Sequence, residues 1–173
     1  STLSRGGTVV HADCSERADV LISEGKIVAV GDKLSGDTVI DAGGCYVMPG
    51  GIDPHVHLDM PFMGTYSSDN YETGTRAALY GGTTMVIDFI LQTQGKSLQA
   101  ALQEWKSRSD NNAVGDYSFH MAVTDFNEDT KKEIQHFIEE EGITSFKTFM
   151  AYKGALMIDD RQMIGLMQEV KKH

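Results

Sequence analysis

Two histidines separated by a single residue are the part of this sequence best suited to chemistry. His55 and His57 close an apolar segment that follows Pro49. In a β-strand the side chains at positions i and i+2 point to the same face, so both imidazoles could reach one metal ion. An isolated pair of this kind is more often two surface histidines. The strand-like context and the neighbouring carboxylates of Asp53 and Asp59 instead favour a metal site.

A lysine lies in a second segment that is too apolar for an ordinary solvated ammonium group. Lys147 is placed within residues 145–152, which read Ser-Phe-Lys-Thr-Phe-Met-Ala-Tyr. A buried ammonium is costly and tends to lose its proton. The neutral amine can add carbon dioxide, and the resulting carbamate has two oxygens that can bridge two metal ions. The alternative is a lysine that extends to water or pairs with an acid, and this segment alone favours that alternative. The histidine pair reverses the preference.

The elements that must position these residues fall into two groups. Residues 1–48 contain short β-branched runs separated by Gly and Asp turns, which predicts a small antiparallel β module. After Pro49, apolar strand-like runs alternate with helix-like stretches. The expected strands, after one near Ile52, cover 84–89, 117–124 and 145–150, and the expected helices cover 70–80, 97–108, 129–141 and 159–172. Ser97 is the expected N-cap of one helix, and Gly142 is expected to end another.

About four β-then-α units therefore follow one another in residues 49–173, which predicts an α/β fold with a parallel sheet covered by helices. A complete (β/α)8 barrel needs eight units and typically about 250 residues. We expect the first half of a (β/α)8 TIM-type barrel preceded by the small β module. An open, doubly wound sheet is the alternative. The histidine pair at the carboxyl end of a strand favours the half barrel, because barrel active sites lie there.

The charge and composition of the chain limit the kinds of partner that it can bind. The chain carries 15 Lys and Arg against 25 Asp and Glu, a net charge of -10, which argues against a nucleic-acid partner. The strongest apolar run, 85–91, is too short for a membrane span, and no signal peptide is visible. Cys14 and Cys45 do not form a spaced set with histidines, so a reduced cytoplasmic setting is the expectation.

Three motifs, at 51–57, 81–84 and 145–152, resemble the dihydropyrimidinase and D-hydantoinase family of the amidohydrolase superfamily, and the resemblance covers essentially the whole chain. It implies hydrolysis of a dihydropyrimidine or 5-substituted hydantoin ring to an N-carbamoyl amino acid, as in pyrimidine catabolism. It also implies a binuclear Zn2+ site, bound by His55 and His57 and bridged by carboxylated Lys147.

The same resemblance assigns roles to aromatic residues. Tyr152 would donate a hydrogen bond to the oxyanion formed when the ring amide is attacked. Phe62, Phe149 and Leu156 would surround the exocyclic group of the substrate. Homotetramers are common in such a family, so a homo-oligomer is expected.

This sequence also departs from the family pattern. Two further histidines and an aspartate that serves as ligand and proton shuttle have no candidate here, so we expect the 173-residue chain to be inactive alone. An allantoinase or dihydroorotase type of enzyme is one alternative, although Leu58-Asp59 lacks the arginine that would bind a substrate carboxylate. A non-catalytic dihydropyrimidinase-like protein with a structural or signalling role is another. Retention of the three ligands speaks against it.

Two further polar residues fall inside predicted strands. Asp88 could orient a ligand histidine or be a hydrogen-bonded core carboxylate, and the sequence does not separate these readings. His120 is expected to be a core residue. Met60 and Met63 are expected to flank the site.

Overall fold

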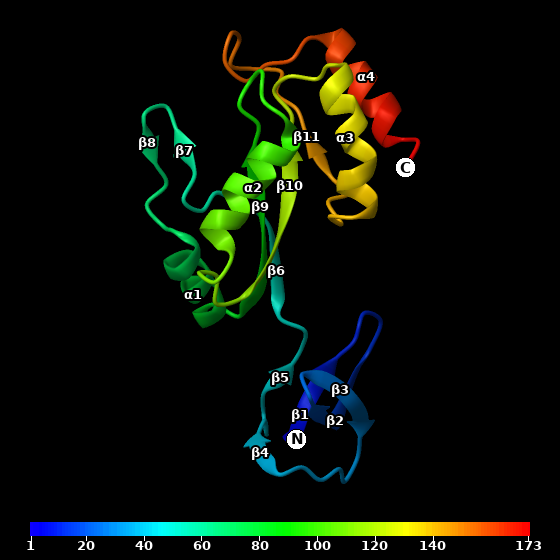
Figure 1. Ribbon diagram of the computed structural model, residues 1–173. Coiled ribbons are helices and arrows are strands. Elements are labelled where there is room, and N and C mark those ends of the chain that lie inside the picture. Colours follow the sequence, from blue (N-terminus) through cyan, green and yellow to red (C-terminus); the bar gives the residue numbers. More distant parts are fainter. The chain divides into compact units, whose positions relative to one another are not determined.

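The computed structural model describes residues 1–173, which divide into two compact units, Ser1–Pro49 and Gly50–His173 (Figure 1). The first unit is a mixed β-sheet centred on β1. Its strands are β1 (Thr2–Val10), β2 (Ser15–Ser23), β3 (Lys26–Gly31), β4 (Thr38–Asp41) and β5 (Tyr46–Val47). β1 pairs with β2, and β2 with β3, in antiparallel fashion, whereas β4 and β5 run parallel to β1. The predicted antiparallel module is therefore wrong for β4 and β5, because strand propensity does not encode the path of the connecting loop.

A β-bulge, and not a turn, occupies the Gly6-Gly7 pair in β1. The register between β1 and β2 shifts between Ser4 and Gly7, and Gly6 has a φ of 70°, which glycine adopts without a Cβ penalty. The Asp19 carboxylate accepts the backbone N–H of Gly6 at 2.8 Å. The bulged strand packs a small apolar core around Val9 and Val20.

The second unit is built on a four-stranded parallel sheet with the order β11-β10-β9-β6. These strands are β6 (Gly51–Val56), β9 (Thr83–Leu91), β10 (Asp116–Ala122) and β11 (Phe146–Lys147). The register places His120 beside Phe89 and Lys147 beside Ala122. β11 is much shorter than the predicted strand over 145–150, because only Phe146 and Lys147 pair with β10.

Four helices cover one face of this sheet (Figure 1). They are α1 (Tyr71–Tyr80), α2 (Leu98–Ser109), α3 (Glu128–Glu139) and α4 (Asp160–Val170). Each begins after a polar residue whose side chain accepts a backbone N–H of the first turn, namely Asn70, Ser97, Asn127 and Asp159. The predicted N-cap at Ser97 is confirmed. α3 ends earlier than predicted, with Glu140 as its C-cap, and Gly142, with a φ of 68°, lies two residues beyond that cap. None of the helices combines the length and apolar character needed to cross a bilayer.

The core lies between this helical layer and the sheet. Ile90 of β9, Met121 of β10 and Phe137 of α3 are 0% exposed, and Trp105 of α2 is 2% exposed. Full burial of each such side chain contributes about 1.5–3 kcal/mol. Alternate residues of each strand therefore point into this core, and the residues between them face the other side of the sheet.

A short hairpin and one buried glutamine order the loops beside the sheet. A hairpin of β7 (Pro61–Phe62) and β8 (Thr65–Tyr66) has positive φ at both turn residues, Met63 and Gly64, which suits a tight hairpin. The strands are too short to be recognised in the sequence.

The side chain of Gln92, 1% exposed, joins the ends of β9 and β10. Its Oε1 accepts the backbone N–H groups of Thr124 and Asp125, and its Nε2 donates to the carbonyls of Lys96 and Asp125.

Candidate metal and substrate site

The histidine pair lies at the end of β6, on the face of the sheet opposite the helices. The rings of His55 and His57 have centroids 5.2 Å apart and are nearly perpendicular, with an interplanar angle of 86°. Both rings pack on the ring of Phe89 from β9, at centroid distances of 4.6 and 5.1 Å. Both histidines are exposed in this chain. Phe89 thus gives the two imidazoles a common apolar support.

The lysine reaches the same place from the other edge of the sheet. Lys147 is half-buried, and its Nζ lies 5.9 Å from the ring centre of Phe89 and 5.3 Å from that of Phe149. His55, His57 and Lys147 together line one small cavity of about 50 Å³. Residues 90 positions apart in the chain are therefore brought to one point, as the two sequence motifs require.

The electrostatics of this cavity favour a neutral imidazole. Partial desolvation of the ring lowers the pKa of His57, and the nearby charges of His55 and Lys147 lower it further. A neutral ring has a free nitrogen lone pair, which is the form that binds a metal ion.

The donor set fits part of a zinc site. Imidazole nitrogens are common zinc ligands, and a carbamate on Lys147 would add an oxygen ligand. No group of three His, Cys, Asp or Glu side chains that could hold a metal occurs in the chain. The candidate ligands are therefore the two imidazoles and the lysine.

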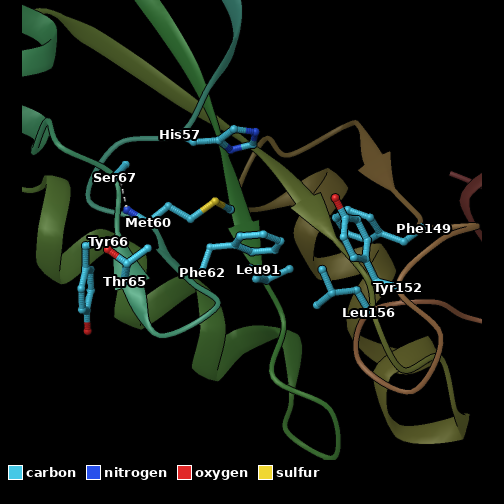
Figure 2. A pocket seen from close by; sticks show the side chains of 10 residues that line it. All are labelled: His57, Met60, Phe62, Thr65, Tyr66, Ser67, Leu91, Phe149, Tyr152 and Leu156. Carbon is cyan, nitrogen blue, oxygen red and sulfur yellow. Dashed lines mark hydrogen bonds between the residues drawn. The ribbon is translucent and has the colours of Figure 1, made fainter.

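A larger cavity of about 410 Å³ opens beside the metal-ligand candidates, and Figure 2 shows its lining. It shares His57, Met60 and Phe149 with the small cavity. The predicted Phe62, Phe149, Tyr152 and Leu156 all line it, and residues that the sequence did not indicate complete it, namely Thr65, Tyr66, Ser67 and Leu91. Thr65 and Tyr66 form β8 of the hairpin, and Ser67 follows it directly. Met63, predicted to flank the site, is 72% exposed and does not line the cavity.

Tyr152 stands at the rim of this cavity with its ring between two phenylalanines. The centroid of its ring lies 5.8 Å from that of Phe62 and 6.0 Å from that of Phe149, in both cases edge to face. Its φ of 61° is unusual for a residue with a Cβ, and its carbonyl accepts the N–H groups of Ala155 and Leu156, both at 3.0 Å. The backbone therefore turns sharply here and directs the ring toward the cavity (Figure 2).

Asp88 is a core carboxylate that acts on the backbone beside the histidine pair. It is 0% exposed and accepts the Tyr71 hydroxyl at 2.7 Å and the backbone N–H of Leu58 at 3.1 Å. Burial raises the pKa of Asp88, and these hydrogen bonds offset part of the increase. Leu58 directly follows His57, so Asp88 fixes the end of β6 through the main chain and not through an imidazole.

His120 does not lie in the helix-covered core, so that prediction is wrong. Strand alternation places Phe119 and Met121 in the core and His120 on the opposite face, half-buried, where its ring packs on Phe89 at 4.7 Å. Both ring nitrogens are hydrogen-bonded, one to Pro54 and one to Ser145. Local sequence could not distinguish the two faces, because Ser118 and Ala122, which share the face of His120, are also small enough for a core.

Residues 46–173 match the Amidohydrolase family, and the chain belongs to it. The predicted fold, the first half of an α/β barrel preceded by a small β module, is confirmed.

Within the family the chain is similar to particular hydrolases. It is 51% identical to a D-hydantoinase of Geobacillus stearothermophilus over 91% of this chain and 34% of that protein. It is 44% identical to the dihydropyrimidinase of Rattus norvegicus over 98% of this chain and 34% of that protein. The crystal structure of dihydropyrimidinase from Brevibacillus agri NCHU1002 superposes with a TM-score of 0.96 at 48% identity, over 99% of this chain and 38% of that one. The chain thus spans about a third of the length of these curated relatives, and the predicted resemblance is confirmed.

Proposed function

We propose that this chain supplies part of the active site of a metal-dependent cyclic-amide hydrolase. The observation that carries the proposal is the convergence of His55, His57 and Lys147 on one small cavity. The adjoining apolar cavity gives a substrate a place beside that point. Similarity to proteins named D-hydantoinase and dihydropyrimidinase supports a ring amide as the bond that is cleaved.

In this proposal His55 and His57 would hold one Zn2+, and Lys147, carboxylated on Nζ, would be the ligand shared with a second. Metal ions held there would supply Lewis-acid chemistry and a more acidic water. His57 favours binding because its surroundings keep the ring neutral. The Nζ of Lys147 lies over the rings of Phe89 and Phe149, beside the two imidazoles, which is where a carboxylated lysine would have to lie to act as a shared ligand.

Tyr152 and the cavity beside it orient the substrate. The Tyr152 hydroxyl donates a hydrogen bond to the oxygen on which negative charge develops, and such a donor stabilises the transition state more than the ground state. Phe62, Phe149 and Leu156 contact the exocyclic substituent of the ring. The lining is mainly apolar and has no arginine, which favours a neutral dihydropyrimidine or 5-substituted hydantoin over a ring that carries a carboxylate.

The remaining parts of the proposal concern the whole protein. Its small-molecule chemistry is expected in the cytoplasm, in a homo-oligomer such as a tetramer. Residues 1–48 contribute to a β-sandwich, and residues 49–173 contribute about four βα units of the barrel. The 173-residue chain is inactive alone, because the cavity that His55, His57 and Lys147 line contains no aspartate to move protons.

The deciding experiment uses the full-length protein. Zinc content is measured together with turnover of dihydrouracil, hydantoin, dihydroorotate and allantoin. We expect two zinc ions per subunit, turnover of the first two substrates, and a carbamate carbon signal from 13C-labelled carbon dioxide that Lys147→Ala abolishes. A folded protein without zinc would favour a structural or signalling role, and preference for dihydroorotate or allantoin would overturn the choice of substrate.

A further inference from the structure

The ring of His120 uses both of its nitrogens to connect two segments of the site. Its Nε2 lies 2.8 Å from the carbonyl oxygen of Pro54, and its Nδ1 is hydrogen-bonded to the hydroxyl of Ser145. A carbonyl oxygen can only accept, so Nε2 carries the proton and donates. In the neutral ring Nδ1 then accepts from the Ser145 hydroxyl. One tautomer therefore satisfies both contacts.

The two partners lie next to the candidate metal ligands. Pro54 immediately precedes His55, and Ser145 lies two residues before Lys147. Pro54 belongs to β6, whereas Ser145 adjoins β11, the strand at the opposite end of the sheet. The ring of His120 therefore links β6 to the segment before β11, although these two strands do not pair with each other.

The carbonyl of Pro54 is available for this contact because the ladder is irregular at that point. Asp53 pairs with Val86 and Val56 with Asp88, so two residues of β6 oppose one residue of β9 between these pairs. A carbonyl in such a bulge needs another donor, and His120 provides it. The interruption that frees the Pro54 carbonyl also contains His55.

Phe89 completes the arrangement as a shared support. The ring of His120 lies 4.7 Å from that of Phe89, with an interplanar angle of 38°. The same ring contacts His55 at 4.6 Å and His57 at 5.1 Å. A displacement of His120 would therefore reach the imidazole pair through Phe89 as well as through Pro54.

We propose that His120 is a positioning residue, which sets the separation between the imidazole pair on β6 and the lysine on β11 by hydrogen-bonding both segments at once. The inference rests on the function proposed above. It assigns His120 no contact with metal or substrate. Groups that orient metal ligands typically change metal affinity 10–100-fold when removed, and an effect of about that size is expected here.

The test compares four variants of the full-length protein. His120→Leu removes both hydrogen bonds at similar volume, His120→Gln restores a donor toward Pro54, and Ser145→Ala removes only the contact beside Lys147. Ser118→Ala is the matched control, because it changes the same face of the same strand and Ser118 contacts neither segment by a hydrogen bond. Zinc release to a chelator, kcat and KM are measured.

We expect zinc release to accelerate about tenfold in His120→Leu and less in His120→Gln, with kcat reduced and KM little changed. Ser145→Ala should lower kcat with the same split, and Ser118→Ala should match the parent protein. If His120→Leu does not fold, His120→Gln and Ser145→Ala decide the matter. Folded variants whose zinc release and kcat equal those of the parent would overturn the proposal.

A second measurement is independent of metal and activity. Nitrogen-15 spectra of the histidine rings should show a protected Nε2–H for His120, and Ser145→Ala should shift its Nδ1 resonance alone. A rapidly exchanging Nε2–H would overturn the bridge even if the protein binds zinc. Absence of zinc from the parent protein, with the Nε2–H still protected, would instead overturn the proposed function and leave the bridge as a structural contact only.

Discussion

The two faces of the parallel sheet in the second unit differ in almost every physical respect. One face packs against four helices and is closed by residues such as Trp105 and Phe137, which are 2% and 0% exposed. The other face carries His55, His57 and Lys147 on a single ring, Phe89, and is largely open in this chain. Successive residues of one strand serve the two faces, so Asp88 is buried among helices while Phe89 supports the site.

The same strands therefore carry core residues on one face and the candidate site residues on the other. Substitutions on the helix-covered face should change the free energy of unfolding and leave the site intact. Substitutions on the open face should change activity and leave stability almost unchanged. We expect four substitutions in the full-length protein to follow this division.

The largest effect is expected from Phe137→Ala on the covered face. Loss of a fully buried aromatic side chain typically costs 3–5 kcal/mol in the free energy of unfolding. Denaturant unfolding measures it, and zinc per folded molecule should not change. Met167→Ala on α4, where the side chain is 62% exposed, is the control and should stay within about 0.5 kcal/mol. Equal destabilisation by both would contradict a core on this face.

The next effect is expected from Tyr152→Phe on the open face. Removal of one oxyanion donor typically lowers kcat 10²–10³-fold. Steady-state kinetics would measure this loss, while the unfolding midpoint should stay near that of the parent. Tyr80→Phe, on a residue that is 90% exposed in α1, controls for the loss of a hydroxyl and should leave both values unchanged. An unaltered kcat in Tyr152→Phe would remove this residue from the proposed chemistry.

Tyr71→Phe tests the covered face through a polar contact. It leaves buried Asp88 without one partner, which should cost about 1–3 kcal/mol at neutral pH. Burial raises the folded-state pKa of Asp88 above its unfolded value, so the stability contribution of this group falls as pH rises between the two values. Loss of the Tyr71 hydroxyl raises the folded pKa further. The cost should therefore be larger at pH 7 than below about pH 3.9, where the carboxyl is protonated in both states.

Unfolding curves across this pH range provide the measurement. Tyr117→Phe is the control, because its hydroxyl bonds to Asp110 in an exposed position, and it should cost less with little dependence on pH. A cost for Tyr71→Phe that is the same at both pH values would contradict an ionised, buried Asp88.

The smallest of the four effects, a change in the free energy of unfolding, is expected for a substitution on neither face of the sheet. Lys106 and Glu141 form an ion pair at 2.6 Å on the outer surface of the helices. The hydrogen bond from Lys106 lowers the pKa of Glu141, so this contribution is present above the unfolded pKa and is lost as pH falls through the lowered folded value. Glu141→Gln should cost about 0.2–1 kcal/mol, with unchanged kcat. High salt should reduce the difference, and an effect above that range would show that the pair supports the core.

The sequence predicted the parts of this fold that are encoded locally. The N-cap at Ser97 follows from a hydroxyl placed before an apolar periodic stretch, and the His-x-His pair follows from strand alternation. Parallel pairing of β4 with β1 could not be predicted in this way, because it depends on where a loop carries the chain. The same holds for the β7–β8 hairpin, whose strands have only two residues each.

The candidate site shows the same limit. The motif residues 55, 57 and 147 were identified by residue type and spacing, and the structure brings them to one cavity. The role of His120 depends on a register between strands that are far apart in the chain, and nothing in residues 116–122 reveals which face of the sheet it occupies. The sequence does not separate the two roles considered for Asp88 for the same reason, since its partners Tyr71 and Leu58 come from other elements.

The hydrogen bonds of Gln92 make this part of the fold sensitive to deamidation. The amide oxygen accepts from two N–H groups, and the amide nitrogen donates to two carbonyls. Deamidation would replace the donating nitrogen by an oxygen of nearly the same size, and that oxygen would face two carbonyl oxygens in a buried position. A change that is almost invisible in shape would thus turn two attractions into repulsions, and spontaneous ageing at this one amide would separate the ends of β9 and β10.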